Sequence, residues 1–87
     1  MELNEAYKQI KDEVLNNTSL KKDANSSLLA LYESTTKIWE AVENNQKEKI
    51  ELRVASALIS VFYVMKELGI KNPEECLNKK LAELKLN

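Results

Sequence analysis

The side chains able to do chemistry in this sequence are carboxylates, hydroxyls and one thiol. There is no histidine, and Cys76 is the single cysteine, which argues against zinc binding and Cys–His catalysis. Ser56 and Ser60 lack a histidine base, and we interpret them as small helix residues whose hydroxyls bond a carbonyl one turn back. The acidic candidates are Glu33, Glu40, Glu48 and Glu51.

A long apolar segment, residues 50–69, must position most of these side chains. Between Val54 and Met65 only the two serines interrupt the apolar run, so a helix formed here would be apolar on nearly all sides and buried on most of them. Arg53 and Lys66 bracket the run, which is too short for a membrane span of about 20 residues. The segment is therefore predicted to be the central helix of a bundle.

Start and stop signals predict three further helices. Apolar spacing indicates helices over residues 4–16, with Asn4 as its N-cap, and 25–42, which Asn25-Ser26-Ser27 begins. Residues 20–23 are left open as loop or short helix. The third helix, 47–68, ends at Gly69, and the order Asn72-Pro73-Glu74-Glu75 is typical of the start of a last helix that runs through Leu84.

Composition agrees with one all-α domain spanning residues 1–87. The sequence is 44% hydrophobic with one glycine and one proline, which suits long helices. Thirteen basic residues balance fourteen acidic ones, so no net field would attract nucleic acid or an anionic membrane. With one cysteine and no apolar signal-peptide core at the N-terminus, we expect a cytoplasmic protein. Eighty-seven residues bury a modest core, so we expect association.

Two stretches carry a resemblance to a known family. LYESTTKIWEAV from Leu31, and then ELRVASALISVFYVMKELGIKNPEECLNKKL, resemble the MazG-like branch of the all-α nucleotide pyrophosphohydrolases. The likeness covers residues 28–81 and includes the Leu-Gly-Ile ending before an acidic helix start. It implies a four-helix MazG-like bundle, and in that family a Glu-x-x-Glu and a Glu-x-x-Asp on facing helices gather Mg²⁺ around a nucleoside triphosphate.

The sequence departs from the family at all four carboxylate positions. The resemblance places the first pair on Ser34 and Lys37 and the second on Arg53 and Ser56. Two fixed positive charges there would oppose a divalent cation, so we expect no cofactor and no metal. The same four residues are instead candidates for an anion-binding site, because hydroxyls and cations satisfy phosphate oxygens directly. The competing interpretation has Lys37 and Arg53 turned outward, paired with nearby glutamates.

The remaining candidates have structural explanations. The acids are interpreted as exposed residues, and Trp39, Tyr32 and Tyr63 as core or dimer-interface aromatics rather than a nucleobase platform. Cys76 is interpreted as a small buried hydrophobic residue. The apolar third helix is expected to form an oligomer interface around Val61, Phe62 and Met65.

The sequence thus favours a MazG-like protein that is catalytically inactive and acts as an oligomeric binding or interaction module. Its expected partner is itself, as dimer or tetramer, or another protein, with no nucleic acid and no membrane. One alternative is a divergent Mg²⁺-dependent nucleoside triphosphate pyrophosphohydrolase that uses displaced carboxylates. The other is a helical interaction protein unrelated to MazG.

Overall fold

The chain is helical throughout the part that the structure describes. A computed structural model describes residues 2–17 and 19–86, with side chains to residue 85. The elements are α1 (Leu3–Ile10), a π-helical turn η1 (Lys11–Leu15), α2 (Ala24–Glu43), α3 (Lys47–Glu67) and α4 (Pro73–Leu86). No strand forms among these residues. The predicted all-α class is confirmed.

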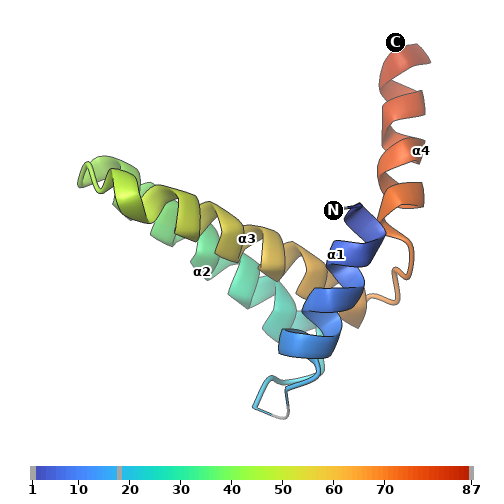
Figure 1. Ribbon diagram of the computed structural model, residues 1–87, viewed down its shortest axis with the longest axis horizontal. Coiled ribbons are helices and arrows are strands. Elements are labelled where there is room, and N and C mark those ends of the chain that lie inside the picture. Colours follow the sequence, from blue (N-terminus) through green and yellow to red (C-terminus); the bar gives the residue numbers. More distant parts are fainter. Residues whose placement is uncertain (1, 18, 87) are drawn as a thin grey trace.

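Helices α2 and α3 form an antiparallel hairpin, the long arm in Figure 1. The turn between them is short because Asn45 adopts a left-handed conformation, φ 56°, that asparagine tolerates. The amide of Gln46 then bonds the carbonyl of Ala41 at 2.9 Å, which satisfies a carbonyl at the end of α2. The predicted glycine ending of α3 is also confirmed, since Gly69 has φ 78° and Ile70 N bonds Met65 O at 2.8 Å.

The two hairpin helices meet along a seam of alternating four- and three-residue spacing. The seam residues are buried or half-buried, and Ser34 and Ser60 touch at its centre, with their hydroxyl oxygens 2.8 Å apart. This spacing keeps one stripe of each helix facing its neighbour. On α2 the seam is Ser27, Leu31, Ser34, Ile38 and Ala41, and on α3 it is Ile50, Arg53, Ala57, Ser60, Val64 and Glu67.

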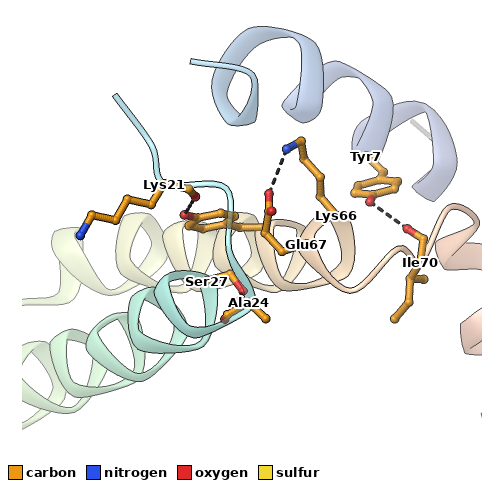
Figure 2. A network of polar contacts seen from close by, with 8 residues as sticks. Tyr7, Lys21, Ala24, Ser27, Lys66, Glu67 and Ile70 are labelled. Carbon is orange, nitrogen blue, oxygen red and sulfur yellow. Dashed lines mark hydrogen bonds and ion pairs between the residues drawn. The ribbon is translucent and has the colours of Figure 1, made fainter. Parts of the chain in front are cut away.

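The core lies at the open end of the hairpin, where α1 and η1 pack on α3. Tyr7, Leu15, Phe62 and Tyr63 form it, and the rings of Tyr7 and Phe62 are tilted by 43° with centroids 5.2 Å apart. Both tyrosine hydroxyls are satisfied by backbone. Tyr7 donates to the carbonyl of Ile70 at 2.9 Å (Figure 2), and Tyr63 donates to the carbonyl of Lys21. Burial of these rings fixes α1 against the hairpin.

Helix α4 begins as predicted but does not lie alongside the others. Asn72 caps it by accepting a 3.0 Å bond from the amide of Glu75, and Pro73 is buried at its first position. Figure 1 shows α4 projecting away from the hairpin. It is held at its first turn by Asn4, whose amide and side-chain oxygen exchange two 3.1 Å bonds with Glu74. The expected four helices are present, but within one chain they do not close into a bundle.

Two predicted helix starts are wrong. Asn4 is not the cap of α1, because the helix begins at Leu3 and Glu2 occupies the cap position. Helix α2 begins at Ala24 rather than at Asn25. Asp23 is its cap, and the Asp23 carboxylate accepts a 2.7 Å bond from the amide of Ser26. Aspartate and asparagine are equally good caps, so neighbouring candidates compete on tertiary packing. Residues 20–23 form no helix.

Candidate functional site

Ser34 belongs to the hairpin seam rather than to an open pocket. Its hydroxyl lies 2.9 Å from the carbonyl oxygen of Ala30 and 2.8 Å from the hydroxyl of Ser60. Ser60 in turn bonds the carbonyl of Ser56 at 3.1 Å. The backbone bonds are the one-turn-back bonds expected of serine inside a helix. The two hydroxyls have two protons for three contacts, so one serine donates to the other hydroxyl across the seam while the second donates to the carbonyl one turn back in its own helix.

Of the other three residues of the candidate anion site, Arg53 lies farthest from Ser34 along the hairpin. Arg53 precedes Ser60 by seven residues, which places it about 10 Å along the α3 axis from the level of Ser34. Arg53 is half-buried, whereas Lys37 and Ser56 are exposed. The structure brings Ser34 to Ser60, and it forms no ion pair to Lys37 or Arg53 among the described residues. Anion binding here stays a prediction.

The acidic side chains are exposed and separate. Glu33, Glu40, Glu48 and Glu51 are all solvent-exposed, as the sequence predicted. Within residues 2–17 and 19–86, no cluster of three or more acidic or cysteine side chains has the arrangement of a metal site. Cys76 is exposed, contrary to the expectation that it is buried. It lies on the projecting α4, which covers little of its own surface.

The three residues predicted to form an oligomer interface have different environments. Phe62 is 4% exposed because Tyr7 and its neighbours cover it within the same chain. Met65 packs against that core and is half-buried. Val61 is half-buried and lines an apolar groove on the other side of the hairpin. Of the three, Val61 is the residue that faces an open surface.

That open surface extends from Val61 across α3 and onto α2. It is a continuous apolar side of the hairpin, which we call the open face. Tyr32 and Trp39 are 67% and 68% exposed on it, and the indole of Trp39 lies along α2, donating a 2.6 Å bond to Glu43. The open face comprises Leu28, Tyr32, Thr35, Trp39 and Val42 from α2 with Val54, Leu58 and Val61 from α3.

Shallow grooves cross the open face. One, of about 640 Å³, lies between α2 and α3 and has an almost wholly apolar lining that includes Leu31, Val54 and Leu58. The second, of about 560 Å³, runs beside Tyr32 and Trp39 and shares Thr35 with the first. Without convergent charged or catalytic groups, such grooves suit contact with apolar side chains rather than chemistry on a small molecule.

The pKa shifts in the molecule arise from structural contacts. Burial raises the pKa of the Tyr7 and Tyr63 hydroxyls, and the nearby Glu67 carboxylate adds to the effect. The Ser26 amide bond lowers the pKa of Asp23, with a smaller contribution from the Ser26 hydroxyl. These groups lie in the core and at a helix cap, so they stabilise the fold.

Comparisons with known proteins give no relative for this chain. No protein-family model, no curated protein and no solved structure matches it. In the part of the chain that the structure describes, none of the helices combines the length and apolar character needed to cross a membrane.

Proposed function

We propose that this chain is a non-catalytic helical interaction module, which acts by packing the open face of the α2–α3 hairpin against another helical surface. The observation that carries the proposal is the exposure of large apolar side chains on one side of two rigid helices. Leu28, Trp39 and Leu58 are each about half exposed or more. Removing apolar surface from water contributes roughly 25 cal/mol per Å², so a covered face is strongly favoured.

The relationship to MazG-like proteins is part of this proposal. Its support is the short antiparallel connection between α2 and α3 and the Gly69 ending that leads into the capped start of α4. The positions that would carry the family's carboxylates hold Ser34, Lys37, Arg53 and Ser56. A protein of this kind would retain helices for assembly without the groups that hold Mg²⁺.

The competing enzymatic function is tested directly. Purified protein is incubated with a panel of nucleoside triphosphates and Mg²⁺ or Mn²⁺, and pyrophosphate release is measured. We expect no release. Turnover that disappears in Glu33→Gln or Glu51→Gln protein would show that displaced carboxylates support catalysis, and the non-catalytic proposal would then be wrong.

A further inference from the structure

The open face repeats the spacing of the seam that already joins α2 to α3. On α2 its residues each follow a seam residue by one position, as Tyr32 follows Leu31 and Trp39 follows Ile38. On α3 the same offset relates Val54 to Arg53 and Leu58 to Ala57. A step of one residue turns about 100° around a helix. Because the helices are antiparallel, the two equal steps lead to the same side of the hairpin.

A helix with two adjacent stripes of this spacing contacts two neighbouring helices. One stripe of each hairpin helix packs against the other hairpin helix in the same chain. The second stripe of each helix forms the open face. This is the pattern of two helices taken from a four-helix bundle, in which each helix packs on two others. The missing half must present two antiparallel helices with the same spacing, which a second copy of this hairpin does.

We propose that the open face binds the open face of a second copy, so that two hairpins form an intermolecular four-helix bundle. The inference rests on the proposed function and names its partner. The order in the bundle places α2 of one copy opposite α3 of the other. In this order every helix is antiparallel to both of its neighbours, which also pairs opposite ends of the helix dipoles.

The single chain exposes more surface than a compact protein of its mass. Its accessible area is 6678 Å², whereas a compact folded protein of 10.0 kDa exposes about 5,200 Å². The excess, about 1,400 Å², is shared between the open face and the projecting α4, and it exceeds the roughly 800 Å² that each partner buries in a standard stable interface. The radius of gyration, 14.4 Å, likewise exceeds the roughly 12 Å of a compact chain of this length.

Sedimentation equilibrium on two matched variants tests whether the open face forms the dimer interface. Leu58→Glu changes a 55% exposed leucine on the open face, and Leu77→Glu makes the same change at a 51% exposed leucine on α4. We expect wild-type and Leu77→Glu protein to sediment at twice the chain mass of 10.0 kDa. Leu58→Glu protein should sediment at the chain mass, and its helical circular dichroism should be unchanged. A folded monomeric wild type, or dissociation by Leu77→Glu alone, would overturn the proposal.

Disulfide cross-linking tests the order of the helices in a Cys76→Ser background. Thr35 lies near the middle of α2, and Val61 lies at a similar level on α3. Mixing Thr35→Cys with Val61→Cys protein should give a mixed disulfide dimer, while Thr35→Cys alone should stay uncross-linked. Efficient cross-linking of Thr35→Cys to itself would place α2 against α2 and overturn the order.

The two proposals fail in different ways. A folded wild-type monomer that releases no pyrophosphate would contradict the second copy as partner while leaving the non-catalytic module intact. Pyrophosphate release by wild type would contradict the proposed function whatever mass is measured.

Discussion

The hydroxyl of Tyr7 donates a 2.9 Å hydrogen bond to the backbone carbonyl of Ile70, 63 residues away in the sequence. Ile70 directly follows the glycine that ends α3. The same tyrosine places its ring against Phe62. One side chain of α1 thus contacts the last turns of α3 and also, as Figure 2 shows, the connection that leads to α4.

Replacing Tyr7 separates these two contacts. Tyr7→Phe keeps the ring and removes the bond to Ile70, and we expect a loss of about 1 kcal/mol in the free energy of unfolding. Tyr7→Ala removes the ring as well and should lose about 3–5 kcal/mol. Urea unfolding at one protein concentration measures both, since assembly makes stability concentration-dependent. Tyr7→Phe protein as stable as wild type would contradict the role of the hydroxyl.

Phe62 is expected to contribute to folding rather than to assembly. Phe62→Ala should destabilise the chain by about 3–5 kcal/mol because the buried ring leaves a cavity. Leu52→Ala, at a 70% exposed position on the same helix, is the control and should change stability by about 0.5 kcal/mol. If Phe62→Ala protein kept its stability but sedimented at half the wild-type mass, the ring would belong to the interface instead.

Alkaline pH should destabilise the fold through the two core tyrosines. Burial raises the pKa of Tyr7 and Tyr63 above the ordinary value of 10.0, so the folded state retains protons that the unfolded state releases. The resulting stability is fully present below about pH 10 and is lost as pH rises through the folded-state pKa values. Unfolding followed from pH 8 to 12 should show this decline, and the Tyr7→Phe/Tyr63→Phe double variant should show less of it.

The Asp23 cap predicts that the stability of the fold depends on pH in the acid range. The hydrogen bond from the Ser26 amide lowers the pKa of Asp23 below 3.8. The ionised carboxylate therefore stabilises the fold above that pH, and this stability is lost as pH falls through the folded-state pKa. Asp23→Ala should lower the melting temperature at neutral pH. Asp23→Asn should retain the cap without its acid dependence. Equal melting temperatures for wild type and Asp23→Ala would show that α2 does not need this cap.

The predicted anion site is tested by calorimetry with pyrophosphate at low salt. Binding by Lys37 and Arg53 should produce heat that falls as salt rises, because screening weakens contacts between exposed charges. The Lys37→Ala/Arg53→Ala variant should lose that heat. Lys47→Ala/Lys49→Ala, which removes two charges near the hairpin tip, should retain it. Heat that is absent in wild type, or equal in both variants, would leave the four residues without a ligand of their own.

The helices were largely predictable from sequence because their end signals are local. Gly69 permits a left-handed residue, and Asn72-Pro73 caps α4 and begins it, whatever packs nearby. The direction of α4 was not predictable. It depends on Asn4, whose bonding partner is 70 residues away, and no local pattern encodes such a contact.

The open face was only partly predictable. The apolar character of residues 50–69 indicates that α3 needs more than one neighbour, but the sequence does not say which side α1 will cover. In the structure α1 covers Phe62, so the uncovered side is the one that carries Leu58. The contact between Ser34 and Ser60 depends on the register of two packed helices, and a shift of one turn would have brought Ser34 to Ser56 instead.

The mutual bonds between Asn4 and Glu74 also constrain the order in which the molecule can fold. The α2–α3 hairpin needs to close only the short turn around Asn45, so its contacts form at small entropic cost. Joining Asn4 to Glu74 must instead close a loop of nearly the whole chain. Two 3.1 Å hydrogen bonds at the start of a helix contribute too little to close that loop unless the core around Tyr7 has already formed. We therefore expect the hairpin to form first and α4 to take its final direction last.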